Sequence, residues 1–232
     1  MKRMIKISLI LLLVGMAVIA AVPFLKEKRA ERKYENEFKN IQESVTEKKS
    51  DVNGLVKKNK DCIGYVQIPG TTISYPVMQT KDNPDFYLNH DFNRNYSFYG
   101  TPYLSAYCDV EKSDNLIIYG HNINGGKMFG ALEKYKDKEF FSKHRKIYFT
   151  TDKKREYEVF AVMSVIIHEF EYWKFVMARD AKEYDEFVDR VEEHSLRKQE
   201  NKPKYGEQVL MLSTCDNGKG DDWRIVIIGV VK

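Results

Sequence analysis

The sequence predicts a mainly β domain, either a closed barrel or a sandwich. An apolar N-terminal segment and a helical extension precede this domain. The chain has 232 residues, 43% of them apolar, with 15 Tyr and 13 Phe, which suits one sizeable β-rich domain plus an appendage. Short apolar runs separated by turns indicate the strands. They lie at 63–68, 72–78, 103–107, 115–119, 146–151, 156–167, 209–212 and 225–228.

The N-terminal segment is an almost uninterrupted apolar run from Ile7 to Leu25 with basic residues on both sides. This length is close to the roughly 20 residues that cross a bilayer. Cleavage after Val18-Ile19-Ala20 would make it a signal peptide, but the run is long for that, and we favour an uncleaved anchor. The richer basic flank follows the run, so the positive-inside rule alone would leave the domain in the cytoplasm.

Two helices are predicted beside the strands. In residues 27–48, apolar residues recur at spacings of three and four, which predicts an amphipathic helix that packs on the protein's own domain. Residues 50–59 then form a polar connection. Asp180 and Glu183 resemble a capping box at the start of a helix that ends near Leu196, and a shorter helical segment is expected near 128–135.

Three residues with reactive chemistry each lie at a strand end. Cys215 follows the run 209–212, Arg224 begins the run 225–228, and His121 follows the run 115–119. A histidine commonly activates a cysteine nucleophile, and an arginine supplies a permanent charge for the oxyanion of acyl transfer. The pattern indicates a transacylase site without an obvious carboxylate member. Taken alone, Cys215 could equally be a buried strand-end thiol.

These residues resemble the signature of class B sortases. The matching segments are Leu212-Ser213-Thr214-Cys215, the downstream Arg224 and Tyr119-Gly120-His121-Asn122, and further stretches are similar at 63–71, 73–77, 83–88 and 100–104. One departure is Met211, where the family usually has Thr. We expect it to alter the packing of the strand rather than the chemistry.

The resemblance implies a closed eight-stranded β-barrel with N-terminal helices and a long helix inserted before the catalytic strand. It also implies that Cys215 is the nucleophile, that His121 gives and takes the proton, and that Arg224 stabilises the oxyanion. The substrate groove would include Asn83, Leu88, Tyr172, Trp173, Ser213 and Thr214. For Tyr172 and Trp173, ordinary core packing remains equally open.

The function that the resemblance implies is that of a membrane-anchored cysteine transpeptidase of the Gram-positive cell surface. It would cleave a C-terminal sorting signal of a secreted protein after Thr and join the acyl group to an amine of a peptidoglycan precursor or cross-bridge. This places a single-pass anchor at 1–26, a helical extension at 27–60 and an extracellular catalytic barrel at 61–232, against the positive-inside rule. A hydrolytic cysteine peptidase and a catalytically silent surface-binding domain stay open as alternatives.

Other classes of partner are not indicated. A net charge of +4, without a basic segment interleaved with aromatics, gives no reason to expect nucleic acid. The loop 216–222 lacks the terminal Glu of a calcium loop, and the three cysteines lack zinc spacing, so we expect no metal or cofactor. Cys62 and Cys108 could form a disulfide, although we favour two separate reduced thiols. The four remaining histidines are expected to be structural: His90, His144, His168 and His194.

Overall fold

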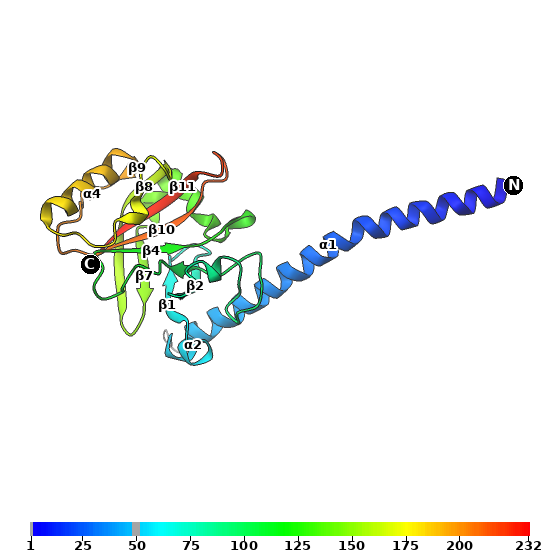
Figure 1. Cartoon of the computed structure of the whole chain (residues 1–232), viewed down its shortest axis with the longest axis horizontal. Coiled ribbons are helices and arrows are strands. Elements are labelled where there is room, and N and C mark those ends of the chain that lie inside the picture. The colour runs from blue at the N-terminus through cyan, green and yellow to red at the C-terminus, as the bar shows by residue number, and fades with distance from the viewer. Residues whose placement is uncertain (1, 48–51) are drawn as a thin grey trace. The chain divides into compact units, whose positions relative to one another are not determined.

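The computed structural model describes residues 2–47 and 52–232, and the chain divides into two compact units, one up to Asn40 and one from Ile41 to Lys232 (Figure 1). The helices are α1 (Lys2–Glu47), α2 (Val52–Lys58), α3 (Lys138–Lys143) and α4 (Ala181–Glu193). Short 3-10 turns are η1 (Phe86–Leu88), η2 (Asn124–Gly126), η3 (Gly130–Lys136) and η4 (Tyr172–Lys174). The strands are β1 (Cys62–Gln67), β2 (Ser74–Met78), β3 (Tyr103–Leu104), β4 (Asn115–Tyr119), β5 (Asn122–Ile123), β6 (Lys127–Met128), β7 (Lys146–Thr150), β8 (Lys154–Ile166), β9 (Ser195–Lys198), β10 (Val209–Cys215) and β11 (Trp223–Val231).

The predicted apolar segment and the predicted amphipathic helix form one helix, α1, with Pro23 inside it. Its part from Ile10 to Glu43 contains a stretch long and apolar enough to cross a membrane, with a mean hydropathy of 2.1 and no buried residue. Residues 48–51, where the predicted helix ends and the polar connection begins, lie outside the described residues. The rest of that connection is helical rather than irregular, because Val52 and Leu55 are buried on one side of α2.

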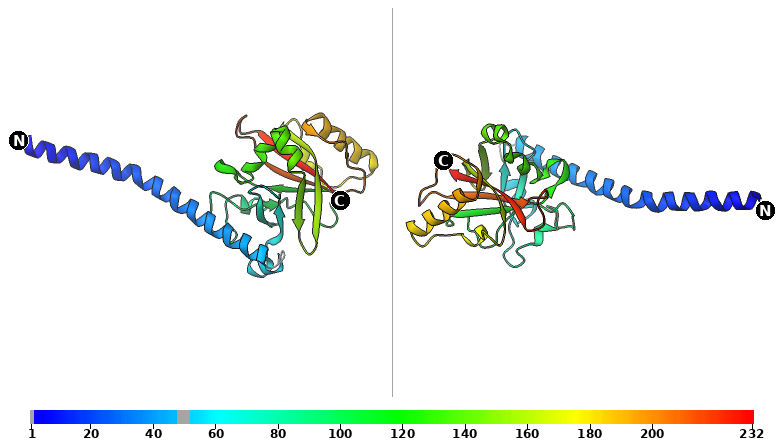
Figure 2. Two further views of the ribbon diagram at one scale, coloured as in Figure 1. Left: turned by 180° about the vertical axis from the view of Figure 1, so that it is seen from behind. Right: turned by 90° about the horizontal axis from the view of Figure 1, so that it is seen from above.

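Eight strands close into the predicted barrel. Their order is β11, β10, β4, β3, β2, β1, β7 and β8, and the antiparallel pairing of β11 with β8 joins the two ends. β9 extends the sheet from β8, and α4 packs against β8 and β9 (Figure 2). The N-terminal helices and the helix inserted before β10 are likewise present.

The strands that carry the predicted reactive residues form the centre of the core. Every residue of β10 before Cys215 is buried, which explains its continuous apolar run. Met211 is fully buried, and its sulfur lies 3.7 Å from the amide nitrogen of Asn115 on β4. Met211 is therefore a packing residue inside the barrel.

Two local predictions need correction. The strand expected at 103–107 stops at Leu104, because the amide of Cys108 donates to the carbonyl of Ser105 and turns the chain. The short helical segment expected near 128–135, by contrast, is present as the 3-10 helix η3. The long helix ends at Glu193 rather than near Leu196, which belongs to β9.

The capping box of α4 forms only in part. The carboxylate of Asp180 accepts a hydrogen bond from the amide of Glu183, 2.9 Å away, as predicted. The carboxylate of Glu183, however, accepts from the amide of Arg179, one residue before the cap. Two side-chain hydrogen bonds therefore stabilise the start of the helix, but Glu183 pairs with the amide of Arg179 instead of the amide of Asp180.

Candidate active site

Cys215 and Arg224 stand opposite each other in the hairpin of β10 and β11. The two strands are antiparallel, and the last pair of Cα partners is Cys215 with Arg224. Just beyond this pair, the amide of Asp216 donates to the carbonyl of Trp223, 2.9 Å away. Because directly opposed residues of a sheet project to the same face, a thiol and a guanidinium share one end of the barrel.

The guanidinium of Arg224 is held by the loop beside it. Its Nη1 donates to the carbonyls of Asp221, at 2.6 Å, and Trp223, at 2.9 Å. Within residues 2–47 and 52–232, its Nε and Nη2 make no hydrogen bond. A half-buried guanidinium with a fixed plane and unused N–H groups can bind an oxyanion.

β4 brings His121 to the same end of the barrel. β4 runs parallel to β10, with Tyr119 paired to Ser213, and parallel strands end at the same edge. The amide of Gly120 donates to the carbonyl of Ser213, and the hydroxyl of Thr214 donates to the carbonyl of Gly120, at 3.1 and 2.6 Å. His121 follows directly and therefore lies next to the last residues of β10.

The His121 ring is oriented by the end of η1 and by the loop that follows it. Its Nε2 lies 2.8 Å from the carbonyl oxygen of Leu88, and its plane is within 9° of the Phe98 ring at a centroid distance of 6.3 Å. Because a carbonyl can only accept, Nε2 carries the hydrogen. In the described chain no hydrogen bond joins the ring to Cys215, so Nδ1 remains open to a substrate or to the thiol.

Cys215, His121 and Arg224 all line one groove of about 660 Å³. Five of the six predicted substrate-binding residues line it: Leu88, Tyr172, Trp173, Ser213 and Thr214. Asn83 is not part of the lining. It is exposed before Pro84, and its carbonyl accepts from the hydroxyl of Thr80, 2.6 Å away.

Sequence reasoning missed three tyrosines of the groove. The Tyr103 hydroxyl donates to Asp85, 3.1 Å away, and burial together with that carboxylate raises the pKa of Tyr103 above its usual range. Burial also raises the pKa of Tyr119, whose ring lies 5.5 Å from that of Tyr103. Tyr107 is 77% exposed at the rim. Tyrosines are common in a β-rich core, so no local sequence signal separates these from packing residues.

Tyr172 and Trp173 belong to η4, and Tyr172 contacts β10. The hydroxyl oxygens of Tyr172 and Ser213 are 2.7 Å apart, and burial raises the pKa of Tyr172 to about 12 despite this bond. Tyr172 therefore carries its hydroxyl hydrogen at neutral pH. The indole Nε1 of Trp173 is buried and has no partner among the described residues. A carbonyl of a bound peptide would satisfy it.

A buried carboxylate directly follows Cys215. Asp216 is fully buried, and its two oxygens accept from Lys136 and Ser164, each at 2.6 Å. Burial opposes its ionisation, but these two bonds, together with the positive charges of Lys136 and Lys219, outweigh burial and hold the pKa of Asp216 below its ordinary value. Its place after the predicted nucleophile was the one available signal for this residue.

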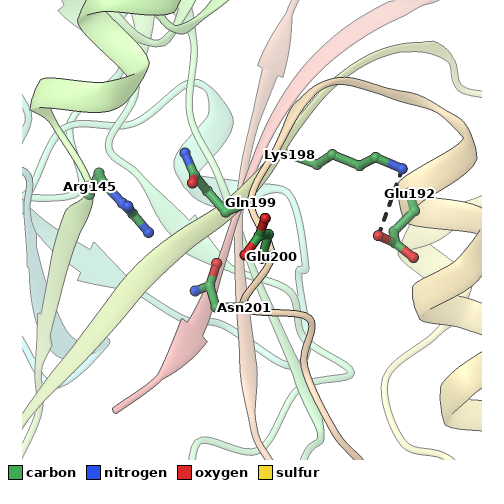
Figure 3. A pocket seen from close by; sticks show the side chains of 6 residues that line it. All are labelled: Arg145, Glu192, Lys198, Gln199, Glu200 and Asn201. Carbon is green, nitrogen blue, oxygen red and sulfur yellow. Dashed lines mark ion pairs between the residues drawn. The ribbon is translucent and has the colours of Figure 1, made fainter.

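A second hollow, of about 630 Å³, contains no reactive side chain (Figure 3). It is lined by Arg145, Glu192, Lys198, Gln199, Glu200 and Asn201. The amine of Lys198 lies 3.8 Å from Glu192, and the remaining lining residues are polar or charged. Neither a nucleophile nor a histidine lines it, so the groove beside Cys215 is the candidate active site.

The remaining predicted features have simple environments. Cys62, Cys108 and Cys215 are all free, and the first two are buried. Burial raises the pKa of the Cys62 thiol to about 12, so it stays protonated. A search of the described residues finds no group of three metal-ligating side chains.

Comparison with known proteins agrees with this architecture. The family model of the sortase domain matches residues 66–232. Sortase B of Listeria monocytogenes is 32% identical over 186 residues, which cover 79% of this chain and 74% of that protein. A Staphylococcus aureus sortase B–substrate complex is 26% identical with a TM-score of 0.75, covering 89% of this chain and 97% of that one. A sortase B complexed with triglycine is 27% identical with a TM-score of 0.77, covering 89% and 98%.

A family model that spans residues 66–232, together with these relatives, establishes the family: the chain belongs to the sortases, which are cell-surface enzymes. Its relatives and the solved structures place it in class B. The chain is therefore a cysteine transpeptidase, as the sequence motifs indicate.

Proposed function

We propose that this chain cleaves a C-terminal sorting signal after Thr and transfers the acyl group to a peptidoglycan amine, with Cys215, His121 and Arg224 as its catalytic residues. The observation that carries the proposal is their convergence on one groove from three strand ends, with Cys215 and Arg224 as direct partners across a hairpin. The groove residues Leu88, Tyr172, Trp173, Ser213 and Thr214 would hold the peptide. A role for Asn83 would need contact from outside the groove.

In the first half of the reaction, the Cys215 thiol gives its proton to the open Nδ1 of His121, and the sulfur attacks the carbonyl carbon of the substrate Thr. The carbonyl oxygen becomes an oxyanion, which the unused N–H groups of Arg224 stabilise. The carbon–nitrogen bond then breaks, the leaving amine takes a proton from His121, and a thioester to Cys215 remains.

In the second half, an amine attacks the thioester carbonyl. His121 takes the proton from this amine, the oxyanion forms again beside Arg224, and the Cys215 thiolate leaves. The sortase B complexed with triglycine supports a peptide amine as the acceptor class. The product is an amide between the sorted protein and the acceptor.

Mass spectrometry of the full chain in detergent micelles tests this function. The chain is incubated with peptides that end in Thr-Gly or Thr-Asn motifs, and an acyl adduct on Cys215 is expected. Adding triglycine should discharge the adduct as a peptide–triglycine product. Cys215→Ala should form no adduct, whereas Cys108→Ala, which removes a buried thiol, should leave the adduct in place.

The same experiment separates the alternatives. Free acid as the only product, even at high triglycine, would mean a hydrolytic peptidase. Cleavage that persists in Cys215→Ala would refute the assigned nucleophile. If no peptide gives an adduct or is cleaved, the proposed specificity for Thr is wrong.

We further propose that α1 anchors the enzyme, with residues 1–26 in the membrane, 27–60 as a helical extension and 61–232 as an extracellular catalytic domain. The apolar stretch within Ile10–Glu43 supports a single span. Protease shaving of intact cells should remove the catalytic domain while a cytoplasmic marker stays intact. Protection of the domain until the cells are lysed would contradict this orientation.

A further inference from the structure

A series of polar side chains that do not line the groove links the residues after β4 to the residues after β10. The amide nitrogen of Asn122, the residue after His121, donates to the carbonyl of Cys215 at 2.7 Å and to one carboxylate oxygen of Glu133 at 2.8 Å. Both partners can only accept, so the amide orientation is unambiguous. One side chain thus ties the main chain of the proposed nucleophile to the strand end that carries the proposed acid–base.

The link continues through η3 to Asp216. The other oxygen of Glu133 lies 2.5 Å from the amine of Lys136, and this amine donates to Asp216 at 2.6 Å. The second oxygen of Asp216 accepts from Ser164 on β8. The buried Asp216 is therefore held on both sides, and a cation bridges two carboxylates.

Two further bonds brace the same series. The side-chain amide of Asn217, two residues after Cys215, donates to the carbonyl of Asn122, 3.2 Å away. The guanidinium of Arg197 on β9 donates to the carbonyl of Lys136, 2.9 Å away. One network of hydrogen bonds therefore joins β8, β9 and η3 to the residues that follow β4 and β10.

We infer that Asn122, Glu133, Lys136 and Asp216 form a positioning relay that sets Cys215 against His121, and that Asp216 acts through this relay and the main chain rather than as a third catalytic residue. Both oxygens of Asp216 are used by Lys136 and Ser164, and in the described chain none bonds to His121. Misplacing reacting groups by about 1 Å can cost roughly 100-fold in rate, whereas the groove that binds the peptide is lined by other residues.

This inference rests on the proposed catalytic roles. It predicts that variants of the relay lower kcat while KM stays nearly unchanged. In the full chain in detergent, Asn122→Leu and Lys136→Met should each lower kcat by roughly 10- to 100-fold, with KM within about twofold. Lys136→Arg retains a bridging cation and should restore kcat to within about threefold. Lys146→Met, which breaks an exposed ion pair with Glu156 elsewhere in the barrel, is the matched control and should keep the wild-type kcat.

Alkylation of Cys215 by iodoacetamide gives a second readout that needs no substrate. The second-order rate constant, measured by mass spectrometry well below the melting temperature, should change several-fold in Asn122→Leu and Lys136→Met. Coupling is also expected, so the double variant should lose much less kcat than the product of the two single losses.

The outcomes distinguish the relay from its alternatives. If Asp216→Asn abolishes kcat while Lys136→Met and Asn122→Leu retain it, Asp216 acts directly and the relay is refuted. If the relay variants lower only the melting temperature and leave kcat and alkylation unchanged, the network is merely structural. Turnover that survives Cys215→Ala would instead overturn the proposed function, a result that is independent of the relay variants.

Discussion

At the scale of single residues, the buried carboxylate of Asp216 makes stability depend on pH in a defined direction. Its pKa is lower in the folded protein than its ordinary value of about 3.9, so the folded state favours the ionised form. The resulting stabilisation is fully present above that ordinary value and is lost as the pH falls through the folded pKa.

Asp216→Asn should therefore cost about 1–3 kcal/mol in the free energy of unfolding at pH 7, because it removes the charge that faces Lys136. The difference from the wild type should shrink as the pH falls below about 4. Urea unfolding of both proteins at several pH values measures this difference in unfolding free energy. A difference that stays constant down to about pH 3 would contradict the role of ionisation.

The pair of Tyr172 and Ser213 gives a second residue-scale prediction. Tyr172→Phe leaves the almost fully buried Ser213 hydroxyl without its partner 2.7 Å away, so we expect a loss of about 1 kcal/mol in unfolding free energy. Ser213→Ala should cost a similar amount, and the double variant should cost less than the sum. Additive losses in urea unfolding would show that the two hydroxyls do not interact.

The same scale shows how far sequence reasoning reaches into the site. Cys215, His121 and Arg224 could be proposed because each is a reactive residue type at a strand end, and the structure brings them to one groove. Lys136 could not, because it contacts Asp216 across 80 positions of the chain and has no periodic or motif signal. The family resemblance predicts Asn83 in the groove, but Asn83 is not among the lining residues. The next two residues, Pro84 and Asp85, line the groove instead.

At the scale of elements, the end of β4 depends on a close approach of backbone and ring. A Cβ on Gly120 would lie 2.8 Å from the ring of Phe129, which is fully buried and cannot swing away. Gly120→Ala should cost about 1–3 kcal/mol in stability and lower peptide cleavage by more than about tenfold, since His121 is the next residue.

Gly218→Ala is the matched control for this prediction. It lies in the loop after β10, and its added Cβ would meet nothing closer than 3.7 Å, so stability should change by less than about 0.5 kcal/mol. Thermal unfolding and cleavage of a sorting peptide measure both variants. If Gly120→Ala and Gly218→Ala have the same stability and the same cleavage rate, the close contact of Gly120 with Phe129 does not position the end of β4.

The elements predicted most accurately are those whose pattern is set by burial. The run 115–119 coincides with β4, because it lies buried in the sheet between β3 and β10. The end of α4 was misplaced, because Leu196 continues the apolar stripe although it belongs to β9. Periodicity alone does not record where a helix gives way to an edge strand.

At the scale of the whole molecule, the sequence alone left barrel and sandwich open, and only the pairing of β11 with β8 decides between them. That contact joins residues more than 50 positions apart, such as Arg224 and Val165. It depends on the twist of all eight strands rather than on any one of them. The family resemblance supplied this information, which strand-by-strand reasoning lacked.

The division into two units predicts that membrane association and catalysis can be separated by substitutions within α1. Leu13 and Val14 are each 54% exposed in the apolar stretch, and an arginine in the middle of a span costs about 2.5–3.5 kcal/mol on insertion. Leu13→Arg combined with Val14→Arg should therefore move the full chain from the carbonate-resistant membrane fraction into the supernatant. Because Cys215 lies in the other unit, the variant should still form the thioester with a sorting peptide. Leu13→Ile with Val14→Leu is the control and should stay in the membrane, and retention of the double arginine variant there would refute anchoring by this stretch.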